Sequence, residues 1–358
     1  MRTNDRRWRR HVRVLTGAIL ACTSALFAAP EASEAQVPTA TYTPLVGDFL
    51  SGDGRDEVLY YAPGPGSDTL MGFGMGIDRP FAWPFAAFTA NGTYTPLVGD
   101  FDGDRADEIL WYAPGPAPDS MWHFRPAGTF SAAVVSVPFQ INGDYGRPTA
   151  GDFTGDGTDD VLWYAPGTAP DVMWDFDQGG GHTSTGRTIS GTYQPVTASF
   201  GNDVTDDILW YAPGAQLDPM WDHVPGSTGY TQQVYDVRGT YSPFTVDLYA
   251  DGPGGEDIFW YAPGAGGDSV WDFHGGQRRS FPDPQPGYYV PAAGDFFVDG
   301  PEEILWDNDA ESVLWDHHPG STSPERTGWV WAKTRPGVPD QSETAPGPAV
   351  PLGALPAR

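Results

Sequence analysis

One segment recurs six times along this chain, and the repetition constrains the fold more strongly than any other feature. The tyrosine of Tyr-Ala-Pro-Gly falls at positions 61, 112, 164, 211 and 261, and Asp307 takes its place in the sixth copy, which gives spacings of 46 to 52 residues. A steady period of this length indicates supersecondary units that are stable only when they pack against their neighbours. The six copies are TPLVGDFLSGDGRDEVLYYAPG (43–64), GDFDGDRADEILWYAPG (99–115), RPTAGDFTGDGTDDVLWYAPG (147–167), QPVTASFGNDVTDDILWYAPG (194–214), SPFTVDLYADGPGGEDIFWYAPG (242–264) and VPAAGDFFVDGPEEILWDNDA (290–310).

Each repeat predicts four short strands. In the second copy they are PLVGDF (96–101), DEILWY (107–112), DSMWHF (119–124) and AAVVSVPF (132–139). Pro114 and Gly115 follow the second strand and suit the central positions of a type II turn, because glycine tolerates the positive φ that this turn requires.

The second strand carries the architectural information. Side chains alternate along a strand, so Ile109 and Trp111 face one side while Leu110 and Tyr112 face the other. Both faces are apolar, and no helical segment lies between the copies to cover them. Radially stacked four-stranded blades bury both faces, so the sequence predicts an all-β fold, a six-bladed β-propeller of antiparallel blades. A linear β-solenoid is the alternative, although repeats near this length are long for it.

Between the first and second strands lies an acid-rich loop. Counting from Asp100 as position 1, side-chain oxygens stand at positions 1, 3, 5 and 9, and a backbone carbonyl near position 7 can add a ligand. Ca²⁺ prefers about six to eight oxygen ligands and tolerates irregular geometry. Since the loops contain no His or Cys, zinc and copper are disfavoured. The alternative is that these acids only form polar turns at the rim.

These loops and the strands around them resemble FG-GAP (VCBS-type) repeats, the units of the integrin α-subunit propeller and of many exported bacterial proteins. The resemblance covers about residues 41 to 333 and implies calcium bound through positions 1, 3, 5 and 9 with a carbonyl at position 7, here Ala106 or Thr158. Carried over by position, the implied side-chain ligands are Asp100, Asp102, Asp104 and Glu108 in copy two; Asp152, Thr154, Asp156 and Asp160 in copy three; Asp48, Asp53 and Glu57 in copy one; and Asp295, Asp299 and Glu303 in copy six.

Some copies depart from the family pattern. Copy one has an extra residue, copy six has Phe297 at position 3, copy four keeps only Asp203 and Asp207, and copy five is lengthened and keeps no clear register. Copy two has Arg105 where copy three has Gly157. If that position needs a positive φ, the arginine costs on the order of 1 kcal/mol.

The ends of the chain differ from the repeats. Six arginines and an apolar run occupy the first part of residues 1–35, which we expect to be an export signal peptide cleaved near Ala35. The only cysteine, Cys22, allows acylation as a lipoprotein as a less favoured alternative, and no second candidate membrane segment follows. We therefore expect a secreted or cell-surface protein with a propeller at 36–334 and a Pro-rich disordered tail at 335–358.

The net charge and the recurring tryptophans indicate which classes of ligand the protein could bind. With 47 acids against 19 bases the formal net charge is −28, which disfavours nucleic acid. We expect a monomeric protein-binding or adhesion module with an extracellular protein or glycan ligand. Recurring Trp residues in strands two and three favour packing between blades, with a carbohydrate-binding lectin as the alternative. His123 and His223 follow strand-three tryptophans, but no catalytic constellation accompanies them, so we predict no enzyme.

Overall fold

The computed structural model describes residues 42–339 except 51, 76–79, 129–130, 202, 250–254, 265–266, 275–276, 298–299, 309–310, 318–325 and 336–337. The described residues form strands, turns and bends but no helix, and the strands make six antiparallel sheets. The predicted export signal at 1–35 lies outside the described residues. Of the predicted tail, Arg335 ends strand β24 (Arg326–Arg335) and Val338–Pro339 forms the short strand β25 beside it. Residues 336–337 and 340–358 lie outside the described part.

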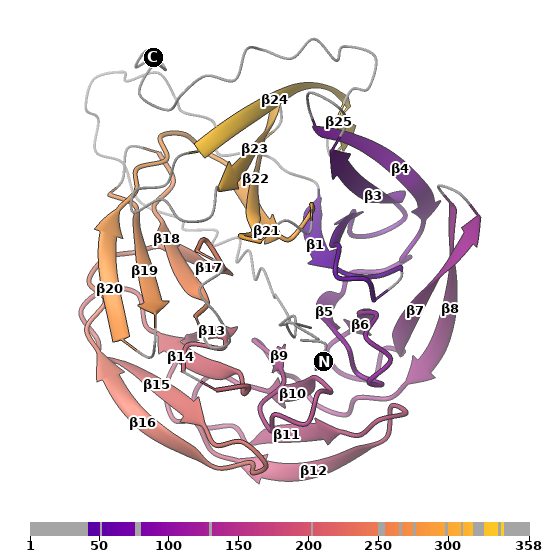
Figure 1. Cartoon of the computed structure of the whole chain (residues 1–358). Helices are drawn as coiled ribbons and strands as arrows, with labels where there is room; N and C mark the ends of the chain where they lie inside the picture. The colour runs from indigo at the N-terminus through magenta and orange to yellow at the C-terminus, as the bar shows by residue number, and fades with distance from the viewer. Residues whose placement is uncertain are drawn as a thin grey trace, which may run out of the picture.

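The sheets are six blades in chain order, as the repeat predicts (Figure 1). Their strands are β1 (Thr43–Gly47), β2 (Glu57–Tyr61), β3 (Asp68–Met75) and β4 (Pro80–Phe88) in blade one; β5 (Thr95–Gly99), β6 (Glu108–Tyr112), β7 (Asp119–Gly128) and β8 (Ser131–Phe139) in blade two; β9 (Thr149–Gly151), β10 (Asp160–Trp163), β11 (Asp171–Phe176) and β12 (His182–Arg187) in blade three; β13 (Gln194–Ala198), β14 (Asp207–Tyr211), β15 (Asp218–His223) and β16 (Tyr230–Tyr235) in blade four; β17 (Ser242–Val246), β18 (Asp257–Tyr261), β19 (Ser269–His274) and β20 (Gln277–Pro282) in blade five; and β21 (Val290–Gly294), β22 (Glu303–Asp307), β23 (Glu311–His317), β24 (Arg326–Arg335) and β25 in blade six.

The first strand of each blade lies at the centre of the ring, and the fourth lies at the outside (Figure 1). Neighbouring first strands contact one another around the whole ring, including β1 with β21, which joins the last blade to the first. Each blade is built from consecutive strands, and among the described residues no strand is exchanged between blade one and blade six. The ring is therefore closed by side-chain packing and by loop contacts. The prediction of a six-bladed propeller is confirmed.

The hydrophobic core consists of six clusters, one at each junction between adjacent blades. Ile109 and Trp111 pack with blade one, whereas Leu110 and Tyr112 pack with blade three. The two-faced burial predicted from strand two is therefore confirmed. At five junctions the strand-two tyrosine of one blade meets the strand-two tryptophan of the next, with ring centroids 4.8 to 5.2 Å apart; the pairs are Tyr61–Trp111, Tyr112–Trp163, Tyr164–Trp210, Tyr211–Trp260 and Tyr261–Trp306.

The sixth junction, between blades six and one, has a different pair. Tyr60 occupies the tryptophan position and Asp307 the tyrosine position. The Tyr60 hydroxyl is buried without a hydrogen-bond partner in the described part of the chain, and burial together with the nearby Asp307 carboxylate raises its pKa. Asp307 accepts a hydrogen bond from the Ser312 hydroxyl at 2.6 Å. The junction that closes the ring therefore lacks the Tyr–Trp contact that the other five share.

The Tyr-Ala-Pro-Gly turns lie at the opposite ends of the strands from the acid loops. Gly115 has φ +87°, as predicted for this turn. The Tyr112 hydroxyl donates to the Gly143 carbonyl and accepts from the Tyr145 N–H, at 3.1 and 2.8 Å. The buried Asp119 carboxylate accepts from two backbone N–H groups at the same end of the blade. These bonds fix one end of the blade, so the acid loops at the other end are held on a rigid base.

Candidate metal centre

The acid loop of blade two is organised by the carboxylate of Asp100. Its Oδ1 accepts hydrogen bonds from the backbone N–H groups of Gly103 and Asp104, at 2.7 and 3.1 Å. Its Oδ2 accepts from the Arg105 N–H at 2.9 Å. A short carboxylate side chain that bonds the backbone a few residues ahead stabilises a tight turn. The loop is thus held in a closed conformation by its own first residue.

Arg105 has φ +83°, in the left-handed region that favours glycine. The equivalent glycine of blade three, Gly157, has φ +96°. The backbone at this position therefore has a positive φ in both blades, whichever residue occupies it. Arg105 is strained by about 1 kcal/mol or more relative to glycine.

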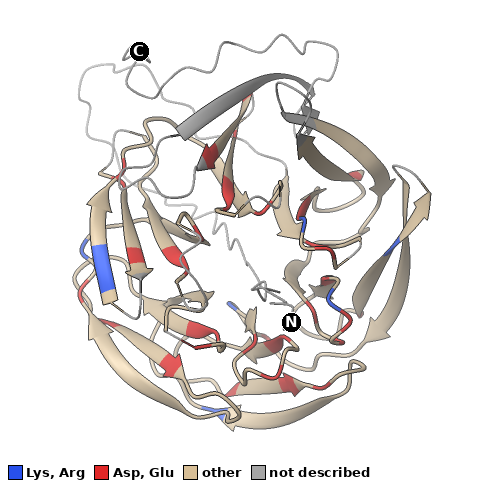
Figure 2. Cartoon of the chain, viewed as in Figure 1, with Lys and Arg blue, Asp and Glu red and all other residues tan. Residues whose placement is uncertain are grey.

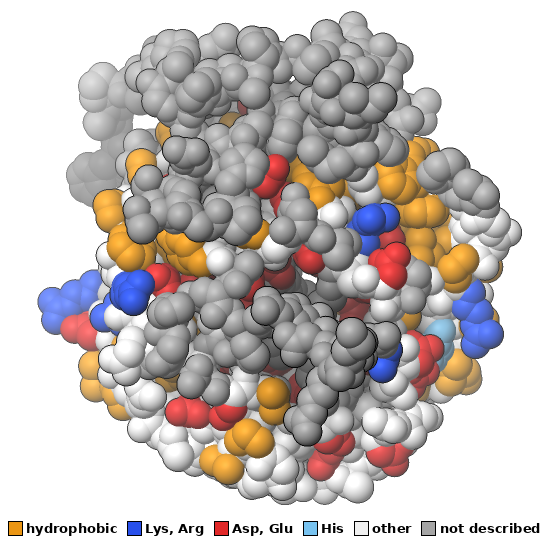
Figure 3. All heavy atoms as spheres, in the orientation of Figure 1, with side chains coloured by type: hydrophobic (Ala, Val, Ile, Leu, Met, Phe, Trp, Pro, Cys, Tyr) orange, Lys and Arg blue, Asp and Glu red, His pale blue; other side chains and the backbone are white. Residues whose placement is uncertain are grey.

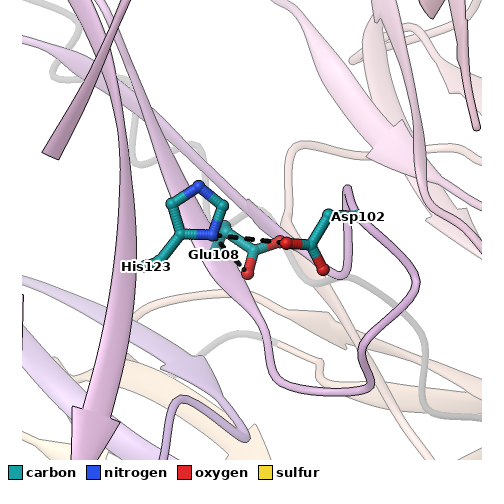
Figure 4. Close-up of side chains that lie close together, drawn as sticks. All are labelled: Asp102, Glu108 and His123. Atoms are coloured by element: carbon teal, nitrogen blue, oxygen red, sulfur yellow. Dashed lines mark hydrogen bonds and ion pairs between the residues drawn. The ribbon is translucent and has the colours of Figure 1, made fainter. Parts of the chain in front are cut away.

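The acids of this loop converge. One carboxylate oxygen each from Asp100, Asp102 and Asp104 lies within 4.8 Å of the others. A second group of three, with the same closeness, comprises Asp102, Glu108 and His123 (Figure 4). Within the described part of the chain, both groups of this kind belong to blade two.

His123 comes from β7 and not from the loop (Figure 4). Its Nδ1 lies 3.1 Å from Glu108 Oε1 and 3.5 Å from Asp102 Oδ2. The expectation that no histidine contributes to the loops is therefore wrong for blade two. The loop segment itself contains no histidine, and the strand pairing of β6 with β7 brings the imidazole to it.

Burial shifts the pKa values in this centre. It raises the pKa of Asp100 to about 6, with N–H bonds from Arg105 and Gly103 opposing the shift. Burial also raises the pKa of Glu108 to about 7, against the hydrogen bond from His123. That same bond raises the pKa of His123. A bound cation would relieve the repulsion among these carboxylates, which is the chemistry expected of a metal loop.

Blade three repeats the loop with one important difference. Asp152 accepts from Gly155, Asp156 and Gly157 as Asp100 does from its loop. However, both oxygens of Asp160 are committed to the backbone, since they accept from the N–H groups of Phe153 and Phe176. Burial raises the pKa of Asp160 to about 9, with a further contribution from the Asp175 carboxylate.

Thr154 supplies an independent sign of a ligand in blade three. Its side chain is buried, and its hydroxyl has no hydrogen-bond partner among the described residues. A buried polar atom without a partner costs about 1–3 kcal/mol. A cation held by this loop would give the hydroxyl oxygen a partner, so the residues present fit an oxygen-bound cation.

The remaining predicted ligands are less complete. In blade one, Asp48 accepts from Gly52 and Gly54, and Glu57 accepts from the Phe49 N–H. Asp53 bonds the Arg55 N–H and is not drawn into a group of three with them within the described residues. In blade six, the side chain of Phe297 is buried in the core and offers no oxygen, and Glu303 accepts from the Phe296 N–H. The backbone N–H of Asp295 donates to the Asp56 carboxylate, and Asp299 lies outside the described residues.

A second set of acids, directly before the closing acid of each loop and numbered 8 here in every copy as in copy two, was not among the predicted ligands. Asp159 Oδ2 accepts from the Asp100 N–H at 2.8 Å, while the Asp159 N–H donates to the Asp100 carbonyl at 2.8 Å. We call this two-bond contact between adjacent blades a loop clasp. The carboxylate always reaches position 1 of the preceding blade; its pairs are Asp107–Asp48, Asp159–Asp100, Asp206–Asp152, Glu256–Ser199, Glu302–Asp247 and Asp56–Asp295.

The loop clasps form a complete ring, and the pair Asp56–Asp295 closes it between blades one and six. Position 8 is acidic in all six copies, including copy four, which has Ser199 and Gly201 at positions 1 and 3. An acid that is present in every copy, even where the metal ligands are replaced, indicates a role other than metal binding. The clasps also fix the register of copy five, with Asp247 at position 1 and Asp257 as the closing acid.

Acidic residues are spread over the blades, and basic residues are few (Figure 2). On the face seen in Figure 3, acidic side chains again occur over several blades. Burial and repulsion from Asp56 and Asp48 raise the pKa of Asp107 well above its usual range, and burial with Asp206 does the same for Asp159. The carboxyl groups of Asp107 and Asp159 therefore resist ionisation.

The aromatic rows serve packing. The strand-two tryptophans are at most 1% exposed. The strand-three tryptophans make T-shaped contacts with them, with ring centroids 5.0 to 5.1 Å apart. In blades three, four and five, the strand-three tryptophan is also covered by His182, Tyr230 and Arg278, respectively. The tryptophans of both rows lie in the clusters at the blade junctions, so the prediction that they pack between blades is confirmed.

Comparison with known proteins agrees with the architecture. The model of the FG-GAP-like repeat family matches residues 100–163, which span the acid loops of blades two and three. No curated protein matches the chain. The matched repeat and the six-bladed ring fit an FG-GAP repeat propeller, a fold that typically binds proteins and is typically non-catalytic. None of the described residues forms a helix long and apolar enough to cross a membrane.

Proposed function

We propose that this protein is an exported β-propeller that binds a protein ligand as an adhesion or interaction module, and that calcium stabilises its acid loops. The observation that carries the proposal is the convergence of Asp100, Asp102 and Asp104 within 4.8 Å in the loop of blade two. Such an arrangement of oxygens suits Ca²⁺. In blade three, Asp152, Asp156 and the hydroxyl of Thr154 supply the corresponding oxygens.

The role of the metal in this proposal is structural. The loops form one end of the blades and contact their neighbours: the Gly179 N–H, from the β11–β12 hairpin, donates to the Asp102 carbonyl at 2.8 Å. The Gly226 N–H donates to the Thr154 carbonyl in the same way. A cation that fixes these loops would also fix the surface on which a ligand binds, because function in a propeller resides on its loops.

Thermal unfolding of the purified protein tests the calcium proposal. We expect the Tm to fall when EGTA is added and to recover when excess calcium is restored. Magnesium at the same concentration is the control, since it demands a tighter octahedral geometry. An unchanged Tm after chelation and after calcium addition would contradict the proposal.

The surface of the propeller favours a protein ligand over a glycan. The faces of Trp174, Trp221 and Trp271 are covered by strand-four side chains, so they do not offer open platforms for sugar rings. Blade four presents Val204 and Val224, which are 40% and 43% exposed and suit a protein contact better than a sugar. A glycan array with and without calcium is expected to stay blank; calcium-dependent glycan binding would favour the lectin instead.

Export is the remaining part of the proposal. It is supported by the arginine-rich start and the apolar run that follows within residues 1–35. The amino-terminal sequence of the protein recovered outside the cell is expected to begin near Gln36. A mature chain that begins at an acylated Cys22 would instead identify a lipoprotein.

A further inference from the structure

The residue after the strand-three tryptophan lies beside the acid that closes each loop. The pairings Ile109–Trp122 and Val161–Trp174 have the same register, so the next residue of strand three stands beside loop position 9 in both blades. Blades three to six have an aspartate there, and blade one has Gly72. Blade two alone has a histidine, His123. The loop of blade two therefore receives a nitrogen donor where four others receive a carboxylate.

The closing acid of blade two is also placed differently. Glu108 is buried, and its Oε2 accepts from the Phe101 N–H at 2.9 Å while its Oε1 faces His123. The shorter Asp160 of blade three instead bonds the backbone of β11. The extra methylene of glutamate thus brings one carboxylate oxygen into the loop, beside the imidazole and Asp102 (Figure 4).

These three donors have the spacing of ligands around one small ion. For tetrahedral Zn²⁺ with bonds of about 2.0–2.1 Å, the ligand atoms are about 3.3–3.4 Å apart. The distances from His123 Nδ1 to the Glu108 and Asp102 oxygens, 3.1 and 3.5 Å, lie on either side of that value. A shared ion fits between them with small adjustments of the side chains.

We propose that Asp102, Glu108 and His123 form a mixed nitrogen–oxygen site that binds a borderline divalent transition-metal ion, Zn²⁺ or its like, in preference to calcium. This deepens the proposed function and rests on its premise that the acid loops hold cations. Imidazole is a ligand for Zn²⁺, Co²⁺ and Ni²⁺, whereas Ca²⁺ takes oxygen ligands. The backbone supports the ligands: the Phe101 N–H orients Glu108, and the Asp104 N–H donates to Asp102 Oδ1 at 3.1 Å.

The test compares metals on the full chain and on His123→Asp, which gives blade two the residue of blades three to six. Calorimetric titration with Zn²⁺ is expected to show a high-affinity site in the original chain that weakens by at least about 100-fold in His123→Asp. Co²⁺ is expected to give visible absorption bands that this variant loses. His182→Asn, which removes a histidine outside the acid loops, is the matched control and is expected to bind Zn²⁺ unchanged.

Equal Zn²⁺ affinity in His123→Asp, or an equal loss in His182→Asn, would overturn the proposal. Asp102→Asn is a second variant that is expected to lose the site, and it keeps the test decisive if His123→Asp does not fold. The calcium-dependent Tm of His123→Asp tests the proposed function separately. A calcium response there without any zinc preference in the original chain would reject the mixed site and leave the calcium proposal standing.

Discussion

The loops of blades two and four have the same place in the ring but different contents. In blade two, Asp100, Asp102 and Asp104 converge, whereas blade four has Ser199 and Gly201 at the first two of these positions. Both loops nevertheless keep the loop clasp: Asp159 bonds the Asp100 N–H, and Glu256 bonds the Ser199 N–H at 3.0 Å. The acids of one motif therefore have two separable roles.

The comparison teaches which acid belongs to which role. The acids at positions 1, 3 and 5 vary between copies, as expected for a site that only some blades need. The acid at position 8 is present in every copy because each blade must be joined to its neighbour. A repeat can therefore lose its metal ligands and still hold its place in the ring.

When no transition-metal ion is supplied, calcium is expected to give the largest difference between the two loops. At a calcium concentration about 100 times the Kd, one site adds about 2.7 kcal/mol to the free energy of unfolding. Asp102→Asn in blade two is expected to remove most of the increase in the free energy of unfolding that calcium gives through this loop. Denaturant unfolding in EGTA and in calcium measures that increase. Asp203→Asn in blade four is the matched control and should leave the calcium increment unchanged. Equal losses from both variants would refute the division of roles.

The loop clasps are expected to matter equally in both blades. Asp159→Ala and Glu256→Ala each leave a backbone N–H of the preceding blade without its carboxylate partner. We expect each to lower the free energy of unfolding by about 2 kcal/mol, in EGTA as well as in calcium.

Asp159→Asn separates the hydrogen bond from the charge. The amide oxygen can still accept from the Asp100 N–H, and the cost of burying a carboxylate near Asp206 disappears. This variant is expected to be at least as stable as the original chain, and its advantage should grow as the pH rises, because the amide does not ionise. If it is as unstable as Asp159→Ala, the contact depends on charge and the clasp interpretation fails.

The pH dependence in EGTA should differ between blades two and three. An acid whose folded-state pKa is raised binds a proton in the folded state that the unfolded chain releases near its ordinary pKa of about 4. Its contribution to stability therefore falls as the pH rises, up to about 7 for Glu108 and up to about 9 for Asp160. Between about pH 7 and pH 9 the Tm should fall by a few degrees.

Two variants test this assignment. Asp160→Asn should reduce the fall of Tm between about pH 7 and pH 9, because the amide does not titrate. Glu108→Gln should change the curve mainly below about pH 7, the range over which the raised pKa of Glu108 makes stability depend on pH. A fall that is unaffected by Asp160→Asn would contradict the raised pKa of that carboxyl.

Much of this structure was predictable because the sequence contains six copies of one unit, which can be compared with one another. Alternation in strand two predicted that Trp111 and Tyr112 face opposite neighbours, and the period predicted six blades. The location of His123 was not predictable from the loop alone, since it depends on how β7 pairs with β6. The clasp acids stand directly before the predicted metal ligands at position 9. For that reason the sequence alone did not distinguish their role, a hydrogen bond to the preceding blade, from metal binding.

At the junction between blades six and one, the repeat pattern predicts the wrong contact. Five junctions have a Tyr–Trp pair, and the repeat predicts the same pair for the sixth. Copies one and six each depart from the pattern at the position that meets the other, with Tyr60 and Asp307 in place of tryptophan and tyrosine. Terminal repeats in such arrays are often atypical. Only the closed ring places these two departures at one junction.

The smallest expected effect concerns the strained arginine. Arg105→Gly in blade two should raise the free energy of unfolding by about 1 kcal/mol or slightly less, because glycine adopts φ +83° without strain but loses more backbone entropy on folding. It also removes a positive charge beside the converging acids, so calcium affinity should rise. Gly157→Arg in blade three should do the reverse on both measures. If the two variants shift stability in the same direction, backbone strain is not what distinguishes the two loops.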